Sequence, residues 1–348
     1  MARKCRFGLI GYGLVAPFHA KALADSQHAE LVAVAGRNPD KARAFCEEHG
    51  GEPLDSIDAL FERDDIDVLN ILTPNASHEE YALKAAAAGK HILVEKPPEM
   101  TLGKTDSIIN ACKANGVKLG IVLQCRFRKA IEAVKAAVDS GRFGTLLHGD
   151  AFMKWFRPQE YYHRDPWRSS RAEGGGVIIQ HAFHYFDLLH HLMGPAKQVQ
   201  ARTSNLMHHD VELEDTVLAF LDYENGAQGV LEASTALFPG TDIRIEINGE
   251  KGTAVMEGER ITTWQFAEER PEDEEIRKIG SVEAQTAAGG AAAFGHYEHM
   301  YLIDDMVHAI REDRDPRVTG ESARGTLEMA LAMYRSADEG RPVTLPLS

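Results

Sequence analysis

The chain has 348 residues, which is more than one ordinary hydrophobic core holds, so we expect two domains. Its 44% hydrophobic and 26% charged residues are typical of a folded globular protein. A formal net charge of -15 argues against nucleic acid as a partner, because phosphate binding needs clustered Lys and Arg. No apolar run approaches the length that spans a bilayer, so we also expect no membrane partner.

The four cysteines are widely scattered and include no C-x-x-C pair: Cys5, Cys46, Cys112 and Cys125. This spacing argues against a disulfide framework or a zinc site and favours reduced, mostly buried thiols. The N-terminus runs directly into a predicted strand, without the apolar segment and cleavage site of a signal peptide. We therefore expect a cytoplasmic protein.

The first third of the chain alternates short apolar runs with helix-like segments. The apolar runs predict strands at 7–10, 31–35, 68–72, 91–95 and 119–123. The segments between them predict helices at 17–25, 39–49, 56–61, 77–88 and 104–115. We expect Pro39, after Asn38, to take the first position of the second helix, and Ser77 with Glu80 to form a capping box on the fourth. The alternation predicts a Rossmann-type, doubly wound parallel sheet in a first domain, residues 1–125, which binds ligands at the carboxyl ends of its strands.

A glycine turn follows the first predicted strand. Gly11, Gly13 and Ala16 fit the pattern G-x-G-x-x-G/A between a strand-like and a helix-like run. Gly11 permits the tight turn, Gly13 lets a pyrophosphate approach the backbone, and Ala16 lets the helix pack on the strand. The pattern predicts dinucleotide binding by Gly11, Gly13 and Leu14, rather than glycines that only end a strand.

The end of the second predicted strand bears on which dinucleotide binds. NAD enzymes usually carry Asp or Glu here, bonded to the ribose 2′-hydroxyl, but this chain has Gly36 followed by Arg37. A guanidinium can bind a 2′-phosphate, so NADP is favoured over NAD. An arginine in a solvated turn, or one that stacks on adenine, is the alternative.

Further polar residues follow the third and fourth predicted strands. Thr73, Asn75 and His78 follow the third, and Glu95-Lys96-Pro97-Pro98 follows the fourth. Because these strand ends meet in the ligand crevice, we expect Thr73, Asn75, His78, Glu95 and Lys96 to contact the cofactor. Glu95 could also hold Lys96 charged.

The rest of the chain reads as a second domain, residues 126–348. Helices are predicted at 128–140, 297–311 and 321–338. Strands are predicted at 146–156, 199–204, 215–222, 228–236, 242–248 and 253–257. A run of strands after a βα region suggests a separate α+β domain. The Ala/Gly-rich segment 284–293 reads as a loop.

Several of these motifs together resemble the Gfo/Idh/MocA oxidoreductases, relatives of glucose–fructose oxidoreductase and inositol dehydrogenase. They are the glycine turn, Thr73-Pro74-Asn75-x-x-His78, the stretch from Gly89 to Pro97, and Gly174-Gly-Gly-x4-His181-x2-His184-x2-Asp187. The resemblance implies a Rossmann domain followed by a C-terminal α/β domain on a large, open, mostly antiparallel sheet. It also implies NAD(P) and hydride transfer at a carbinol carbon of a sugar or cyclitol.

The resemblance carries the catalytic roles onto Lys96 and His184. His184 would be the general base for oxidation and general acid for reduction, because an imidazole titrates near neutral pH. Lys96 would hydrogen-bond the same substrate oxygen and stabilise its developing charge. Inositol dehydrogenase-like members carry Asp four residues before the histidine, where this chain has Gln180. Gln180 can position a hydroxyl but cannot take a proton, and His181 would line the same pocket or pack on the sheet.

Aromatic and basic residues precede the glycine run. The resemblance implies that a Trp-Arg pair here, Trp167 and Arg168, reaches the cofactor or substrate. We expect these two and Tyr162 to bind the substrate, since aromatic faces stack on sugar rings and arginines donate in pairs. Further arginines would suit an anionic substrate such as a nucleotide sugar or uronate: Arg157, Arg164 and Arg171. A helix-and-loop surface with ordinary arginines is the alternative.

Two further expectations concern metals and assembly. His181, His184, Asp187 and His191 have spacings that mimic a metal site, but no thiol or compact carboxylate cluster joins them, so we expect no metal. The pairs His190-His191 and His208-His209 are expected to be exposed or interfacial. The resemblance implies a homodimer or homotetramer through the open sheet of the second domain.

These observations predict an NAD(P)-dependent dehydrogenase or reductase acting on CH–OH groups of a small polyhydroxy substrate: a sugar, a sugar derivative or a cyclitol. A dinucleotide- or sugar-sensing regulatory protein without turnover is one alternative, although it would be expected to lose Lys96 or His184. A reductase of a non-sugar carbonyl compound is another.

Overall fold

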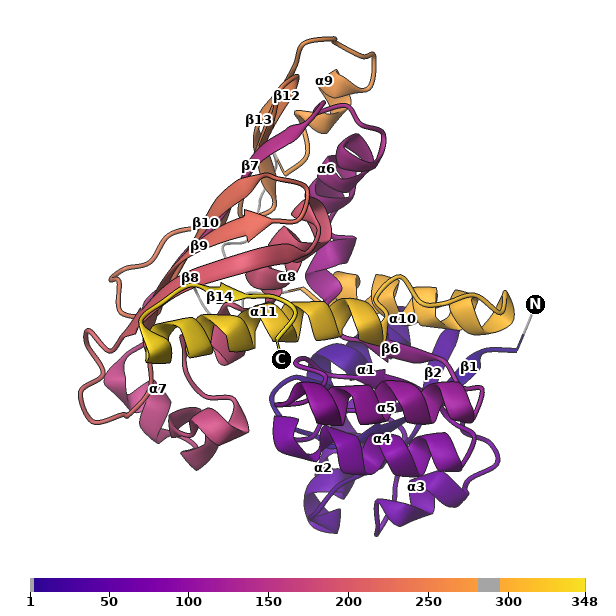
Figure 1. Ribbon diagram of the computed structural model, residues 1–348. Helices are drawn as coiled ribbons and strands as arrows, with labels where there is room; N and C mark the ends of the chain where they lie inside the picture. The colour runs from indigo at the N-terminus through magenta and orange to yellow at the C-terminus, as the bar shows by residue number, and fades with distance from the viewer. Residues whose placement is uncertain (1–2, 281–294, 348) are drawn as a thin grey trace. The chain divides into compact units, whose positions relative to one another are not determined.

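The computed structural model describes residues 3–280 and 295–347. The chain divides into two compact units: unit 1 is formed by residues 1–124 and 295–324, and unit 2 by residues 125–294 and 325–348. The segment 295–324 thus belongs with the first unit, whereas the sequence suggests one continuous second domain. The reason is packing, because helix α10 (Tyr297–Arg311) lies against α1 (Ala16–Asp25) (Figure 1). The predicted loop at 284–293 lies outside the described residues.

Unit 1 is built on a parallel six-stranded sheet with the order β3-β2-β1-β4-β5-β6. Its strands are β1 Cys5–Ile10, β2 Ala29–Ala35, β3 Glu52–Pro53, β4 Val68–Ile71, β5 His91–Val94 and β6 Leu119–Ile121. The predicted doubly wound sheet is confirmed, since five of its strands are the apolar runs of the sequence. These runs are buried on both faces, as expected for parallel strands covered by helices. The two-residue β3, exposed and polar, has no such pattern and was not predicted.

The other helices of unit 1 are α2 Pro39–His49, α3 Asp58–Glu62, α4 His78–Ala87 and α5 Leu102–Ala114, with a 3₁₀ turn at Asn75–Ser77. Pro39 begins α2 as predicted, and the Asn38 side chain caps this helix by accepting hydrogen bonds from the N–H groups of Asp40 and Lys41. The predicted capping box at Ser77 is wrong. The Ser77 hydroxyl instead donates back to Thr73 Oγ1 and the Pro74 carbonyl, so the chain makes a 3₁₀ turn before α4 begins.

Unit 2 contains an eight-stranded sheet with the order β13-β12-β11-β7-β10-β9-β8-β14. Its strands are β7 Leu146–Lys154, β8 Ala196–Ser204, β9 Thr216–Tyr223, β10 Gln228–Ser234, β11 Arg244–Gly249, β12 Gly252–Glu257, β13 Arg260–Phe266 and β14 Val343–Thr344. Only β7 and β10 run parallel, so the predicted mostly antiparallel sheet is confirmed. Along β9, Val217, Ala219 and Leu221 are buried, whereas Leu218 and Phe220 are exposed.

The helices of unit 2 are α6 Lys129–Asp139, α7 Gln159–His163, α8 Phe183–Met193, α9 Asp273–Ile276 and most of α11 Gly320–Glu339. Short turns of 3₁₀ helix occur at Gln124–Phe127, Pro166–Ser169 and Arg171–Glu173, and a π-helix at Val177–His181. Helix α8 packs against β7 and α6. This packing places the π-helix and the first turn of α8 beside the sheet.

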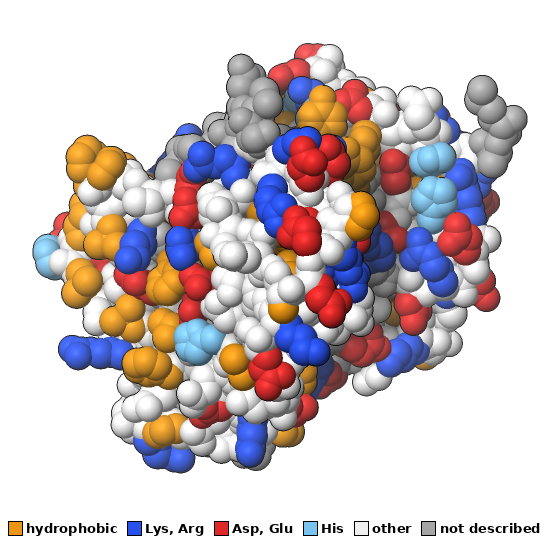
Figure 2. All heavy atoms as spheres, turned by 90° about the horizontal axis from the view of Figure 1, so that it is seen from above, with side chains coloured by type: hydrophobic (Ala, Val, Ile, Leu, Met, Phe, Trp, Pro, Cys, Tyr) orange, Lys and Arg blue, Asp and Glu red, His pale blue; other side chains and the backbone are white. Residues whose placement is uncertain are grey.

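The surface and the thiols agree with a folded globular chain. All four cysteines are free and buried. Among the described residues, no helix combines the length and the apolar character needed to cross a membrane. In the view of Figure 2, Lys and Arg side chains lie among Asp and Glu side chains rather than in one basic patch.

Candidate functional site

The glycine turn after β1 has the geometry that a dinucleotide needs. Gly11 has φ +105°, and a Cβ there would lie 2.9 Å from the Leu72 carbonyl oxygen, so only glycine fits. A Cβ at Gly13 would meet no atom within 4 Å, so the backbone at this position is open to a ligand. Leu14 is 60% exposed beside it, and Ala16 is buried where α1 begins. The turn therefore fits a pyrophosphate at the N-terminus of α1.

Packing explains why a glycine, Gly36, follows β2. A Cβ at Gly36 would lie 2.3 Å from the Tyr12 ring, which covers this position. The Tyr12 hydroxyl accepts a hydrogen bond from the Asn38 N–H and donates to the Asn38 carbonyl, which fixes the ring. A carboxylate is thus excluded from position 36 by packing. Arg37 is exposed, and no hydrogen bond or ion pair within the described residues engages its guanidinium.

His78 does not have the place expected of a cofactor ligand. Its ring is fully buried, with Nδ1 3.0 Å from the Pro97 carbonyl oxygen and Nε2 3.0 Å from that of Thr73. Burial lowers the pKa of His78, so the neutral ring donates to one of these two oxygens at a time. His78 therefore ties the loop after β4 to the loop after β5. Thr73 and Asn75 remain half-buried at the end of β4.

The Glu95 carboxylate also accepts its hydrogen bonds from groups within the protein. It is buried, accepts a hydrogen bond from His19 Nε2 at 3.0 Å, and accepts a second from the Lys96 backbone N–H at 3.1 Å. The expected contact of Glu95 with the cofactor is thus replaced by contacts that hold the chain around Lys96. Lys96 itself is half-buried just after β5.

In unit 2, the π-helix and α8 carry the residues expected to act on the substrate. Gln180 and His181 lie in the π-helix, and His184 is the second residue of α8. The buried Glu214 holds the start of the π-helix, because its carboxylate accepts hydrogen bonds from the Ile178 N–H and the Tyr334 hydroxyl. Burial raises the pKa of Glu214.

Tyr161 is the centre of a cluster of polar and aromatic side chains in unit 2. Its hydroxyl lies 2.6 Å from Gln180 Nε2 and 2.5 Å from a guanidinium nitrogen of Arg168, both of which donate to it. The Arg168 guanidinium also lies over the rings of Tyr161 and Trp167. The structure thus brings together three residues that are expected to bind the substrate, Gln180, Arg168 and Trp167, around a tyrosine that the sequence analysis did not select.

Tyr162, expected to bind the substrate, is instead part of the interior. It is 1% exposed, packs with Val211 and Leu213, and its hydroxyl is hydrogen-bonded to Thr235 Oγ1 at 2.6 Å. Successive residues of the short helix α7 point in different directions, so the adjacent tyrosine takes the place in the cluster. His181 is also buried, with its ring edge-on to Trp155 and tilted against Tyr161.

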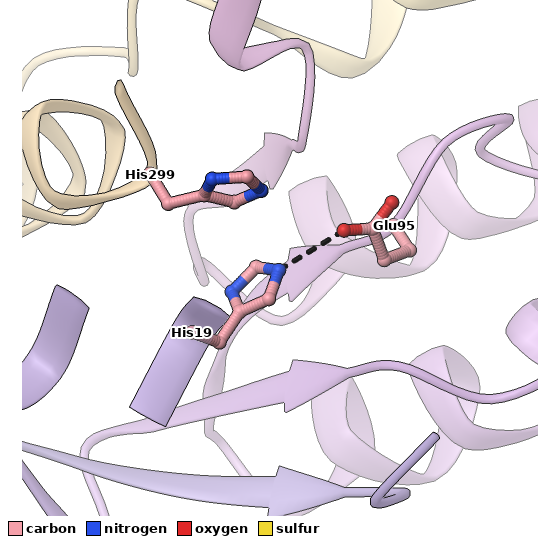
Figure 3. A group of neighbouring side chains, drawn as sticks. All are labelled: His19, Glu95 and His299. Carbon is pink, nitrogen blue, oxygen red and sulfur yellow. Dashed lines mark hydrogen bonds and ion pairs between the residues drawn. The ribbon is translucent and has the colours of Figure 1, made fainter. Parts of the chain in front are cut away.

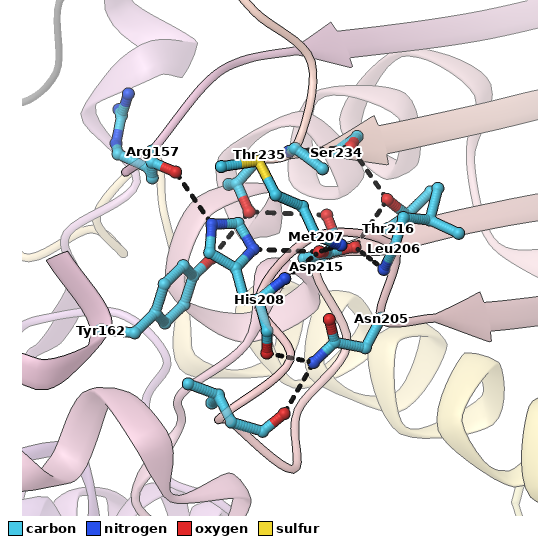
Figure 4. Close-up of polar contacts among 12 residues, drawn as sticks. Arg157, Tyr162, Asn205, Leu206, Met207, His208, Asp215, Thr216, Ser234 and Thr235 are labelled. Carbon is cyan, nitrogen blue, oxygen red and sulfur yellow. Dashed lines mark hydrogen bonds and ion pairs between the residues drawn. The ribbon is translucent and has the colours of Figure 1, made fainter. Parts of the chain in front are cut away.

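His208 is buried rather than exposed or interfacial, because it is hydrogen-bonded on both sides (Figure 4). Nδ1 donates to Asp215 Oδ2 at 2.9 Å, and Nε2 donates to the Arg157 carbonyl at 2.8 Å. Burial opposes the charged ring, but these hydrogen bonds outweigh it and raise the pKa of His208. Asp215 also accepts from the N–H groups of Leu206 and Met207, and its pKa is lowered to about 2 although burial opposes this shift. The ring joins the loop of His208 to the segment after β7 that leads into the Tyr161 cluster.

This contact predicts a pH dependence of stability. The pKa of His208 is higher in the folded state than in the unfolded state. The contact therefore stabilises the folded state fully below the unfolded pKa of 6.5, and this stabilisation is lost as the pH rises through the folded pKa. We expect the free energy of unfolding of unit 2 to fall from pH 6 toward pH 8, by about 1.4 kcal/mol per unit of pKa difference. Urea unfolding at several pH values measures it. His208→Gln should flatten this dependence, and an unchanged slope in that variant would refute the assignment.

Asp187 has a structural partner instead of a catalytic one. Its carboxylate accepts two hydrogen bonds from the Arg126 guanidinium and one from Thr326 Oγ1, and all three side chains are buried. The spacing of Asp187 from the nearby histidines resembles that of metal ligands, but the pair with Arg126 explains the position of its carboxylate. Within residues 3–280 and 295–347, the one group that brings three possible ligand atoms within 4.8 Å of one another is His19, Glu95 and His299 in unit 1.

Comparisons with known proteins agree with this geometry. Residues 5–122 match the model of an oxidoreductase family with an NAD-binding Rossmann fold, and residues 131–255 match the GFO/IDH/MocA C-terminal domain. The WlbA dehydrogenase from Bordetella pertussis, solved in complex with NADH and UDP-GlcNAcA, is 33% identical, with a TM-score of 0.87 over 99% of this chain and 100% of that one. The chain belongs to the Gfo/Idh/MocA oxidoreductase family.

Other members of this family are similar over the same length. The WlbA dehydrogenase from Chromobacterium violaceum, also solved with NADH and UDP-GlcNAcA, is 32% identical over 100% of this chain and 97% of that one, with a TM-score of 0.88. The inositol 2-dehydrogenase of Rhizobium meliloti is 28% identical over 98% of this chain and 99% of its own length. This Gfo/Idh/MocA protein is therefore an NAD-binding oxidoreductase of the dehydrogenase type.

Within this family member, the residues that sequence reasoning missed are those fixed by distant contacts. Tyr161, Glu214 and His19 carry no motif, and their partners lie 19, 120 and 76 residues away in the sequence. The adjacent tyrosines offered the only local signal, but nothing in the sequence tells which of the two faces Gln180.

Proposed function

We propose that this protein is a dehydrogenase that oxidises a nucleotide-linked sugar acid of the class of UDP-GlcNAcA, with transfer of a hydride to NAD(P). The Tyr161 cluster carries the proposal, because Arg157 and Arg168 are both buried around one tyrosine ring. Buried guanidinium groups favour carboxylates and phosphates, which inositol lacks. The similarity to two WlbA dehydrogenases that bind UDP-GlcNAcA supports the same substrate class.

The proposed chemistry keeps the roles that the family resemblance implies for Lys96 and His184. NAD(P), when bound, supplies the nicotinamide ring that takes the hydride from the carbinol carbon. His184 takes the hydroxyl proton of that carbon as general base. The Lys96 ammonium donates a hydrogen bond to the same oxygen and stabilises its negative charge as the proton leaves. Gln180, a neutral amide, positions a neighbouring sugar hydroxyl, with its own side chain held by Tyr161.

The test is turnover on a substrate panel, followed by the absorbance of the reduced nicotinamide. UDP-GlcNAcA should have a kcat/KM at least about 100-fold above that of UDP-GlcNAc, which has no carboxylate to accept hydrogen bonds from these guanidinium groups. Faster oxidation of myo-inositol, or equal use of UDP-GlcNAc, would overturn the substrate class. Tight binding of nucleotide and sugar without turnover would favour the sensing alternative.

For the cofactor we propose NADP as the preferred form, with Arg37 as the residue that contacts its 2′-phosphate. The support is an exposed guanidinium beside a strand end that lacks a carboxylate. NADH in the WlbA complexes favours the other form, so the preference needs its own experiment.

The variant Arg37→Ala tests this preference. We expect it to weaken NADPH binding about 10- to 100-fold and to change NADH binding by less than about threefold, because only NADPH carries the phosphate. Titration of nicotinamide fluorescence measures both affinities, and Arg43→Ala, a matched exposed arginine in α2 that pairs with Asp40 and Asp55, is the control. An equal effect on both nucleotides would show that Arg37 stacks on adenine, and tighter NADH binding in the parent protein would establish NAD.

We further propose a homodimer or homotetramer formed through the sheet of unit 2, and a cytoplasmic location. Leu218 and Phe220 are 49% and 66% exposed on that sheet, which favours a covered face. The four free, buried cysteines suit a reducing compartment. Light scattering of the purified protein measures the mass of the assembly.

A further inference from the structure

Three buried titratable side chains of unit 1 lie together, one of them on the residue before Lys96, and the mechanism above uses none of them. Figure 3 shows His19 from α1, Glu95 at the end of β5, and His299 from α10. Their exposed fractions are 0%, 8% and 6%. Burying a carboxylate this deeply costs free energy unless its oxygens accept hydrogen bonds. The groups that donate to Glu95 therefore indicate its role.

Each oxygen of the Glu95 carboxylate has its own donor. His19 Nε2 donates to Oε1 at 3.0 Å, and the Lys96 backbone N–H donates to Oε2 at 3.1 Å. On the other side of the imidazole, the Asn70 amide donates to His19 Nδ1 at 2.8 Å. Because Nδ1 accepts, the ring proton is on Nε2 and points at Glu95. One chain of hydrogen bonds thus runs from β4, through His19 and Glu95, to the backbone of Lys96.

The surroundings keep this chain in one arrangement. The hydrogen bond from His19 lowers the pKa of Glu95 although burial opposes it, so the carboxylate is ionised. Burial lowers the pKa of His299 to about 3, and this neutral ring packs edge-on against His19 with centroids 4.9 Å apart. Phe18 stacks on His299 in turn. The His19 ring is therefore fixed by packing as well as by its two hydrogen bonds.

We propose that His19 is a positioning residue, which acts through the Glu95 carboxylate to hold the backbone of Lys96 and so aims the lysine at the reacting oxygen. The inference rests on the proposed function of Lys96 and adds a support to it. A displacement of a reacting group by about 1 Å lowers the reaction rate by a large factor. A residue that holds Lys96 in place can therefore have a large effect on kcat. Asn70 belongs to the same support, since it selects the ring nitrogen that carries the proton.

The kinetic test compares two substitutions of His19. His19→Leu removes the donor to Glu95, and we expect kcat to fall about 100-fold while KM for the sugar nucleotide and Kd for NADH change little. His19→Gln can still donate to Oε1 and should recover most of the lost kcat. The control is Leu23→Ala, a buried residue of the same helix α1 that destabilises unit 1 without a hydrogen bond to Glu95. If Leu23→Ala lowers kcat as much as His19→Leu, or if Gln gives no rescue, the positioning role is refuted.

A second measurement does not depend on turnover. In protein labelled with ¹⁵N-lysine, the Lys96 amide resonance, assigned with Lys96→Arg, should move or broaden in His19→Leu and in Glu95→Gln, and stay near its place in His19→Gln. An amide that is unaffected by His19→Leu overturns the inference even if the enzyme is active. A responding amide in a protein with no turnover supports the inference and places the failure with the proposed function.

The same three side chains are the metal-like group of unit 1, so metal content is part of the test. The proposal requires no ion, because the His19–Glu95 distance of 3.0 Å is that of a direct hydrogen bond. A stoichiometric divalent ion in the purified protein that is absent from His19→Gln would overturn it in favour of a metal site.

Discussion

The variant His184→Asn is expected to lower kcat by about 100- to 10,000-fold, the usual contribution of a positioned general base. Asparagine keeps a polar side chain at the start of α8 but cannot take a proton at neutral pH. The affinity for NADH should remain, because this variant leaves the glycine turn at Gly11 and Gly13 unchanged. Steady-state turnover and nicotinamide fluorescence measure the two quantities separately.

Lys96→Met is expected to give a matching result. Removal of the ammonium should lower kcat by about 100- to 1,000-fold, since it takes away the donor that stabilises the substrate oxygen. The two variants should differ in their pH–rate profiles. The limb that reports deprotonation of the base should survive in Lys96→Met and disappear in His184→Asn, because only the latter removes the base. A reversed pattern would exchange the roles of Lys96 and His184.

The control for these variants is His191→Gln, a half-buried histidine two turns further along the same helix. It should retain kcat within about threefold, because it lies away from the first turn of α8. If His184→Asn keeps more than about a tenth of the parent turnover, the base is another residue.

The parts of the fold and site that could be predicted from the sequence are those fixed by local chemistry. The strands of unit 1 are short apolar runs, and the turn at Gly11 and Gly13 needs residues without a Cβ. The strand ends then place Thr73 and Lys96 at one edge of a parallel sheet by topology alone. These inferences require only neighbours in the sequence and the rules of strand order.

What could not be predicted depends on contacts between distant segments. The ring of His299 lies against that of His19, 280 residues earlier, because α10 returns to pack on α1. His208 looks like a surface histidine until Asp215 and the Arg157 carbonyl enclose it. Each case has a polar side chain whose burial is decided by a partner that the local pattern does not contain.

Gly36 shows a different limit, in which a correct observation has two physical causes. The absence of a carboxylate after β2 indicates NADP on chemical grounds, yet the Tyr12 ring would exclude any side chain at this position. A steric cause says nothing about the 2′-phosphate. The preference therefore depends on Arg37 alone, which is why the Arg37→Ala experiment decides it.

Asp187→Ala is expected to destabilise unit 2 by about 3–5 kcal/mol, a large share of the stability of a typical domain. The side chains of Asp187 and Arg126 are almost completely buried, and two guanidinium nitrogens donate to the two carboxylate oxygens. Without the carboxylate, Arg126 keeps a buried charge that no longer has its partner. All three tryptophans, Trp155, Trp167 and Trp264, lie in unit 2, so urea unfolding followed by tryptophan fluorescence reports on this unit.

Two controls separate the ion pair from the loss of a side chain as such. Asp139→Ala breaks the exposed pair of Asp139 with Lys135 and should change stability by less than about 1 kcal/mol. The double variant Arg126→Met/Asp187→Leu should recover much of the loss, because apolar residues of similar size leave no buried charge. A cost below about 1 kcal/mol for Asp187→Ala would mean that water or a rearranged Arg126 replaces the carboxylate. We expect Asp187→Ala to reduce turnover only under conditions that unfold unit 2, although α8 also carries His184. This result would identify Asp187 as a residue that supports the fold and does not take part in the reaction.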